Sequence, residues 1–95
     1  MNSGDLAKDY IESVDHVLES VKINEGPFAV DAHKVRSIVE NVKAYLEDAK
    51  YYLLEERFEV SLASVTYCEG LLDALRMLGT VGFEWPQRKR NVREK

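Results

Sequence analysis

The stretch YCEGLLDALRMLG, residues 67–79, is an almost continuous apolar run that ends at a glycine. Apolar residues recur here at spacings of three and four, which predicts a helix from about Phe58 to Leu78, stopped by Gly79. In helical projection its apolar residues form one wide arc: Val60, Ala63, Tyr67, Leu71, Ala74, Leu75 and Leu78, extended by Val65 and Leu72. We expect this arc to face the core and this helix to be the most buried of the fold.

The polar residues of this helix share the remaining narrow arc, with Leu62 as the one apolar residue among them: Glu59, Thr66, Glu69, Asp73 and Arg76. Glu69 and Asp73 stand four residues apart, where like charges repel, and Arg76 can relieve that repulsion. A pair of carboxylates could hold a cation or exchange a proton, but without a third ligand nearby the pattern is typical of a solvated face. Gly70 costs about 1 kcal/mol relative to alanine in mid-helix, which predicts that a neighbouring helix approaches closely there.

Two further segments upstream have the same helical periodicity. The first begins at a candidate N-cap, Ser3, and ends at Asn24-Glu25-Gly26-Pro27, and the second runs from a candidate cap at Asp31 to about Glu56. No stretch is a convincing strand. We therefore predict an all-α fold, a three-helix up-and-down antiparallel bundle over residues 1–79, followed by a C-terminal extension over residues 80–95.

Composition limits the chain to one domain of 95 residues, with 45% hydrophobic and 32% charged residues. No apolar run reaches the roughly 18–20 residues of a membrane span, and the N-terminus has no signal-peptide pattern. The single cysteine cannot form an internal disulfide, which suits a reducing compartment. We expect a cytoplasmic protein without membrane contact.

The charge of the chain is divided unevenly. Residues 88–95 carry five cations against Glu94, or +4, so the other 87 residues sum to −8. Before this basic tail, Val81, Phe83 and Trp85 alternate, which predicts a strap folded back over an open end of the bundle. The tail cations Arg88, Lys89, Arg90 and Arg93 are candidates for contact with nucleic acid or an acidic partner.

Catalytic patterns are missing from the sequence. His16 and His33 are best interpreted as surface histidines, and Cys68 lies on an apolar arc with no base close in sequence. There is no Gly-rich phosphate loop, nucleophile elbow or paired-cysteine motif. We expect no enzyme activity, no catalytic or metal-binding residues and no cofactor.

Four large apolar residues lie near the expected connection between the second and third helices: Tyr51, Leu54, Phe58 and Leu62. They either seal the end of the bundle or form an exposed patch that another chain covers, most simply in a two-fold dimer. The second alternative makes them candidate interaction residues.

Residues 45–79 resemble the archaeal family known as domain of unknown function 357. The resemblance is carried by Tyr45, Asp48-Ala49, Tyr52, Ala63, Tyr67, Gly70, Leu72, Asp73-Ala74 and Leu78-Gly79, in this order. Of these motif residues, Asp48, Tyr67, Gly70 and Asp73 are the candidate site residues. The chain departs from the family pattern at Glu56-Arg57, where the family has a glycine-containing pair. The resemblance implies a three-helix bundle and no known activity.

Two functions of different classes remain. The first is a non-catalytic protein-interaction module that presents a helical face to itself or to another protein. The alternative is a nucleic-acid-associated accessory protein that acts through its basic tail, whose binding would weaken steeply with salt.

Overall fold

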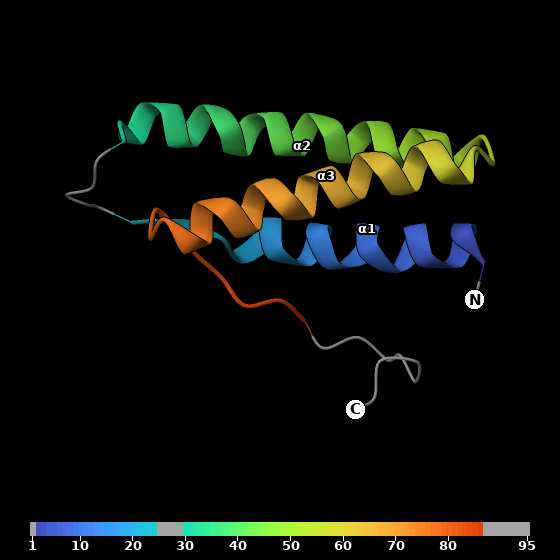
Figure 1. Cartoon of the computed structure of the whole chain (residues 1–95), viewed down its shortest axis with the longest axis horizontal. Helices are drawn as coiled ribbons and strands as arrows, with labels where there is room; N and C mark the ends of the chain where they lie inside the picture. The colour runs from blue at the N-terminus through green and yellow to red at the C-terminus, as the bar shows by residue number, and fades with distance from the viewer. Residues whose placement is uncertain (1, 25–29, 87–95) are drawn as a thin grey trace.

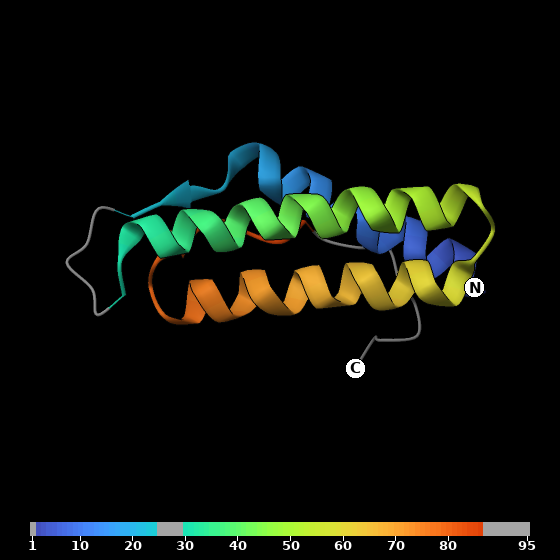
Figure 2. The same ribbon diagram turned by 90° about the horizontal axis from the view of Figure 1, so that it is seen from above.

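Three helices and a short two-stranded ribbon form the part of the chain that the computed structural model describes, residues 2–24 and 30–86 (Figure 1). In chain order the elements are α1 (Ser3–Ser20), β1 (Lys22–Ile23), α2 (Ala32–Leu54), α3 (Phe58–Met77) and β2 (Val81–Gly82). Helices α1 and α3 run in one direction and α2 runs in the other, as Figure 2 shows from above. The predicted all-α three-helix fold is confirmed.

Helices α1 and α2 begin at residues whose side chains cap the helix, whereas α3 begins after Arg57 without a side-chain cap hydrogen bond. Asp31 caps α2 as predicted, with its Oδ1 accepting a hydrogen bond of 3.0 Å from the backbone N–H of His33. The cap of α1 is Asn2 rather than Ser3, because the Asn2 Oδ1 accepts from the N–H of Asp5 at 2.8 Å. Ser3 is instead the first helical residue.

Helix α1 ends at Ser20, earlier than the sequence pattern predicts. Val21 adopts extended backbone angles and leads directly into β1. There Lys22 pairs with Gly82 and Ile23 with Val81 of β2, in antiparallel register. Strands of two residues are too short to show an alternating pattern, so no sequence pattern indicated them. Gly26 and Pro27, the expected helix stop, lie outside the described residues.

The turn between α2 and α3 is made without glycine. Glu56 takes the left-handed conformation, with φ of 62°, and the backbone N–H of Arg57 donates to the carbonyl of Tyr52 at 2.9 Å. This left-handed residue reverses the chain between two long antiparallel helices. The reversal is therefore made without the glycine-containing pair of the family pattern.

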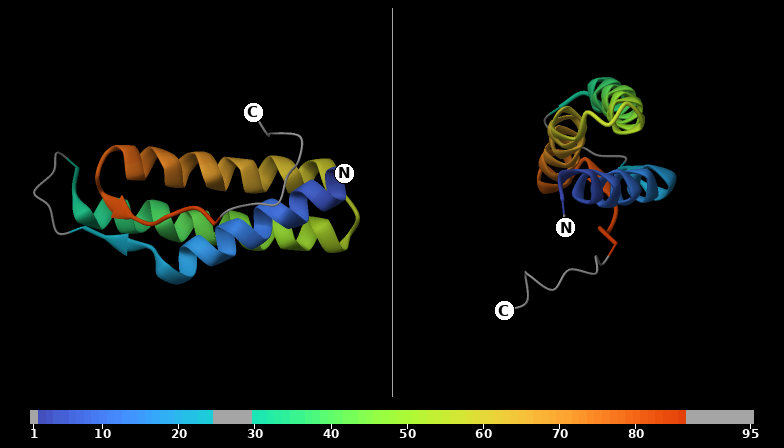
Figure 3. Two further views of the ribbon diagram at one scale, coloured as in Figure 1. Left: turned by 90° about the horizontal axis from the view of Figure 1, so that it is seen from below. Right: turned by 90° about the vertical axis from the view of Figure 1, so that its right-hand side faces the viewer.

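The C-terminal end of α3 is closed by Gly79, Thr80 and Asn24. Gly79 has a φ of 77°, and the buried Thr80 bonds back to the carbonyl of Leu75 through both its N–H and its hydroxyl, at 3.1 and 2.8 Å. The Asn24 side-chain amide donates to the Gly79 carbonyl at 2.7 Å. The segment beyond, Phe83 to Pro86, runs back alongside α3 (Figure 3), and both Phe83 and Trp85 pack against the core. The strap thus covers a side of the bundle rather than its end.

The core contains residues from all three helices in two clusters. The central cluster is Ile11, Val14, Val17, Val42, Leu46, Ala49, Val65, Cys68 and Leu72. The second lies beside the ribbon and consists of Val35, Val39, Leu75 and Val81. One buried hydroxyl and one buried thiol of α3 bond to carbonyl groups of α2. Ser61 Oγ donates to the Ala49 carbonyl at 2.7 Å, and Cys68 Sγ donates to the Val42 carbonyl at 3.5 Å.

The predicted orientation of α3 is wrong. Its buried residues are Ser61, Val65, Cys68, Leu72 and Leu75, whereas Val60, Ala63, Tyr67, Ala74 and Leu78 are exposed. Of the expected arc and its extension, only Val65, Leu72, Leu75 and the half-buried Leu71 face inward. Because a whole side of α3 is open, this helix is not the most buried one. The correct core side was the arc of Val65 and Leu72, which the pattern assigned to the back.

Candidate functional site

The open side of α3 is the candidate site, and we call it the outer face. It consists of Val60, Ala63, Tyr67, Gly70, Ala74 and Met77 of α3 and its C-cap Leu78, together with Tyr45 of α2. In the end-on view of Figure 3, neither α1 nor α2 covers one side of α3. Met77 is 84% exposed and Leu78 62%, and neither side chain forms strong hydrogen bonds with water.

Two tyrosines form the centre of the outer face. The rings of Tyr45 and Tyr67 meet edge to face, with their centroids 4.9 Å apart. This contact joins the outward edge of α2 to α3 and holds both rings at the surface, where each remains about half exposed. Aromatic rings on a fixed backbone present contact area at little cost in conformational entropy, a property of protein-binding surfaces.

Gly70 lies at the middle of the outer face, one turn after Tyr67. A Cβ atom added at Gly70 would meet nothing within 4 Å. The expectation that a helix of the same chain packs closely over Gly70 is therefore wrong. Nothing within the described chain accounts for a glycine here, where alanine would favour the helix by about 1 kcal/mol.

The predicted family-motif residues fall into different places. Tyr67 and Gly70 are on the outer face, and Asp48 is exposed on the adjacent edge of α2. Asp73 points to the other side of α3, where its Oδ1 accepts a 2.7 Å hydrogen bond from Trp85 Nε1 and lies 3.6 Å from Arg76 Nη2. Glu69 is half-buried on that same side. The structure therefore gives Asp73 a role in holding the strap, which the sequence did not reveal.

The predicted interaction residues at the hairpin tip have different surroundings. Leu62 packs against the core, and the ring of Phe58 lies against Gly4 of α1, 3.0 Å from where a Cβ would stand. Leu54 is exposed on α2, and Tyr51 stacks edge to face on Tyr52. Phe58 and Leu62 therefore contact the bundle, whereas Leu54 and Tyr51 are largely exposed.

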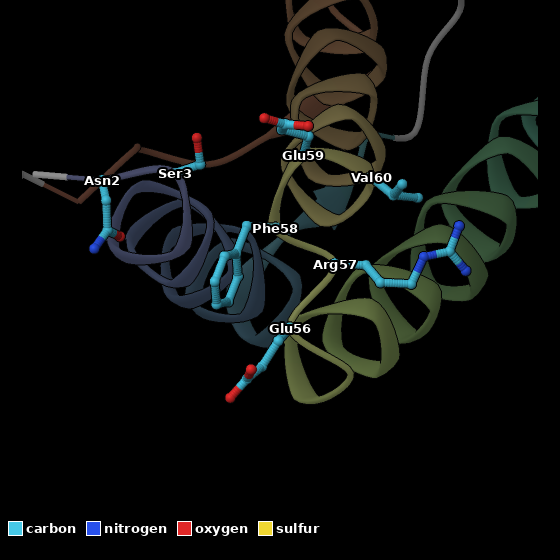
Figure 4. Close-up of a pocket in the computed structure, with 7 residues that line it drawn as sticks. All are labelled: Asn2, Ser3, Glu56, Arg57, Phe58, Glu59 and Val60. Carbon is cyan, nitrogen blue, oxygen red and sulfur yellow. The ribbon is translucent and has the colours of Figure 1, made fainter.

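A hollow of about 530 Å³ opens at this end of the molecule, between the start of α1 and the start of α3 (Figure 4). It is lined by Asn2, Ser3, Glu56, Arg57, Phe58, Glu59 and Val60. Its charged side chains do not converge: Arg57 extends toward α2 and lies over the ring of Tyr52, 5.0 Å from its centroid, while Glu56 points away. The hollow therefore lacks the converging polar groups of a small-molecule site.

The remaining candidate residues are placed as surface or core groups. His16 and His33 are exposed, and no group of three His, Cys, Asp or Glu that could hold a metal ion occurs within residues 2–24 and 30–86. Cys68 is fully buried, and this burial raises the pKa of its thiol to about 11, so it is held in the unreactive protonated form. Arg88, Lys89, Arg90 and Arg93 lie outside the described residues. Across the described ranges, no helix combines the length and apolar character of a membrane span.

Sequence reasoning missed Tyr45, Ala63, Ala74 and Met77 as members of a surface. A signal for them was present, because Val60, Tyr67 and Ala74 are seven residues apart, as are Ala63, Gly70 and Met77. This heptad pattern forms a narrow seam, typical of a helix that packs against one partner helix. The true core arc has the same period, so α3 carries two seams on opposite sides.

Comparison with known proteins places the chain in a family. Residues 9–81, most of the chain, match the family described as "Protein of unknown function (DUF357)". No curated protein and no solved structure matches the chain.

Proposed function

The chain belongs to the DUF357 family of unknown function, and we propose that it is a non-catalytic module that binds another protein through its outer face. One observation carries this proposal: α3 presents a heptad-spaced apolar seam to solvent on the side opposite its own core. A helix that is apolar on two sides is normally covered on both. Contiguous exposed apolar residues flanked by charges mark protein-binding surfaces.

The form of the outer face favours a helix as the bound element. The seam is straight and extends along α3 from Val60 to Met77, and small residues at Ala63, Gly70 and Ala74 leave room for a close approach. Helices that pack over small residues reach interaxial distances of about 8 Å. Binding of a helix along an apolar surface is a common recognition mode.

The non-catalytic part of the proposal is supported by the state of the most reactive side chain. Cys68 is buried in the central core, and its raised pKa keeps the thiol protonated at neutral pH. As the compartment we propose the cytoplasm, where a single buried thiol stays reduced.

Hydroxyl-radical labelling of two tyrosines tests the proposal. Tyr67 and Tyr51 are similarly exposed, at 51% and 57%, but only Tyr67 lies on the outer face. Labelling is compared between the dilute purified chain and the same chain in an extract of its host. We expect protection of Tyr67 and unchanged labelling of Tyr51. Equal labelling of Tyr67 in both samples contradicts the proposal.

The nucleic-acid alternative predicts a different pair of results, one from the labelling and one from a separate measurement of RNA binding. Binding to generic RNA that weakens steeply with salt, with Tyr67 unprotected, would favour the basic tail over the outer face. The body of the chain sums to −8 and repels a polyanion, so the tail would have to act alone.

A further inference from the structure

We propose that the occupant of the outer face is a second copy of this chain, with α3 of one copy antiparallel to α3 of the other about a two-fold axis. This inference rests on the proposed function, since it names the partner of the same surface. Residue size on the outer face and charge along its edge are each self-complementary, and the area of this face is large enough for a dimer.

Residue size selects one antiparallel register. In antiparallel heptad packing, the first seam position of one helix meets the fourth position of its partner. The register with the greatest overlap of two α3 helices places Val60 opposite Met77, Ala63 opposite Ala74, and Tyr67 opposite Gly70 of the second copy. The Tyr67 ring then lies over the space left by the missing Gly70 side chain, and the axis passes between Cys68 and Glu69. A glycine with nothing over it in one chain is thereby covered in the pair.

Charge on α2 agrees with the same axis. Ala49 is level with Ser61, and Val42 with Cys68, so the axis also passes between Asn41 and Val42 of α2. The edge of α2 beside Tyr45 carries Lys34 seven residues before Asn41 and Asp48 seven residues after it, and all three are exposed. A two-fold rotation about this level therefore places Lys34 of one copy next to Asp48 of the other.

Lys34 and Asp48 are available for this pairing. Within the described residues the ion pairs are Lys43 with Glu40, Lys50 with Asp15 and Glu47, and Arg76 with Asp73. Neither Lys34 nor Asp48 belongs to them. Two unpaired opposite charges, placed symmetrically about the level that residue size selects, are an independent indication of a self-complementary face.

The area is sufficient for a weak to moderate dimer. A whole aromatic side chain has a surface of about 150–250 Å². When such areas are scaled by the exposed fractions, the large side chains of the outer face together expose on the order of 500 Å² per copy. Two copies would then bury on the order of 1,000 Å² of apolar surface, to which the small and charged residues add. Specific interfaces begin at about that size.

Sedimentation equilibrium of the full chain and four variants tests the pairing. We expect a reversible dimer for the wild type, a dissociation constant raised about tenfold by Lys34→Glu or by Asp48→Lys, and recovery to within about threefold in the double variant. Gly70→Leu should raise the constant at least tenfold, because a large side chain would meet Tyr67 of the second copy. A double variant as weak as the single ones overturns the Lys34–Asp48 pairing.

Cysteine cross-linking tests the orientation independently. Ala63→Cys and Ala74→Cys are exposed positions that face each other only in the antiparallel pair, and the native Cys68 thiol is buried and does not react. We expect a disulfide-linked dimer when the two variants are mixed and oxidised, and monomer when each is oxidised alone. Cross-linking of each variant with itself would show parallel packing and overturn the proposal.

The outcomes separate this inference from the proposed function. A wild type that stays monomeric to millimolar concentration overturns the second copy as occupant. If Tyr67 is nevertheless protected in the host extract, the outer face binds a different protein and the proposed function stands. If Tyr67 is unprotected there as well, both proposals fail.

Discussion

The indole Nε1 of Trp85 donates a 2.7 Å hydrogen bond to Oδ1 of Asp73, linking the C-terminal strap to the C-terminal part of α3. Arg76 lies 3.6 Å from the same carboxylate oxygen and stacks over Phe83, 5.0 Å from the ring centroid. The Phe83 and Trp85 rings in turn meet edge to face at 5.0 Å. These contacts bind the strap on the side of α3 opposite to Tyr67, so the strap leaves the outer face open.

Trp85→Phe should lower the free energy of unfolding by about 1–2 kcal/mol, because it removes a hydrogen bond to a charged acceptor but keeps most of the ring contact. Urea denaturation followed by circular dichroism measures the change. Glu84→Gln, at the exposed neighbour, is the control and should have no effect beyond about 0.5 kcal/mol. A Trp85→Phe variant as stable as the wild type would mean that the bond to Asp73 is not maintained in solution.

Two truncations should separate the strap from the basic tail. A chain that ends at Pro86 keeps every contact described above and should melt as the wild type does. A chain that ends at Gly82 loses the half-buried Phe83 and Trp85 rings and should be less stable by about 2–5 kcal/mol. Thermal melts at one protein concentration measure both. Equal melting of the two truncated chains would show that the strap contributes nothing to stability.

Gly70→Ala should stabilise the monomer by about 0.5–1 kcal/mol, because the added methyl group meets no neighbour and alanine favours the helix. Measurement at high dilution keeps association out of the result. Gly79→Ala is the matched control and should destabilise, because Gly79 has a φ of 77° that a side chain disfavours. Destabilisation by Gly70→Ala would show that something in the same chain does pack over this position.

Sequence patterns predicted the number, order and approximate limits of the helices because each has a clear period and, at Asp31 and Gly79, a clear capping residue. They failed on the orientation of α3. Its true core side includes Ser61 and Cys68, which add little hydrophobicity, while its open side carries Val60 and Tyr67, which add more. Hydrophobicity alone therefore favoured the wrong side. The bonds that decide the matter, from Ser61 to Ala49 and from Cys68 to Val42, join distant parts of the chain.

The candidate site was only partly predictable for the same reason. Tyr67 and Gly70 were identified by resemblance, but their shared surface with Tyr45 depends on how α3 is rotated against α2. The partner of Asp73 depends on where the strap returns, which no local pattern shows. Local sequence predicts which residues share a helix face, and packing decides whether that face is covered.

Stability should fall between about pH 9 and pH 11 through Cys68. Burial raises the thiol pKa from 9.0 to about 11 in the folded state, so over that range the unfolded thiol ionises while the folded one stays protonated. The stabilising contribution is complete below the unfolded pKa and is lost as the pH rises through the folded value. The loss is about 2–3 kcal/mol at 1.4 kcal/mol for each pKa unit. Denaturation across this range measures it.

Cys68→Ala is the control for this pH dependence. The variant should be less stable at neutral pH, because it leaves a small space in the core, but it should have a flatter profile above pH 9. The two proteins differ at this side chain alone, so the difference between the two profiles isolates the thiol. Parallel profiles would show that Cys68 is accessible to water in the folded chain.

Glu56 holds the reversal between α2 and α3 at a φ of 62°, a conformation that costs a residue with a side chain about 1–2 kcal/mol. Glycine adopts this φ without strain but loses more conformational entropy on folding, so Glu56→Gly should stabilise by a net amount of about 0.5–1 kcal/mol. The neighbouring Glu55 has a φ of −81°, where glycine brings no relief, so Glu55→Gly should destabilise by a similar amount. Both side chains are exposed, so the backbone conformation is the main difference between the two sites. Urea denaturation of the two variants measures the contrast. If both substitutions destabilise equally, Glu56 does not hold the left-handed conformation in solution.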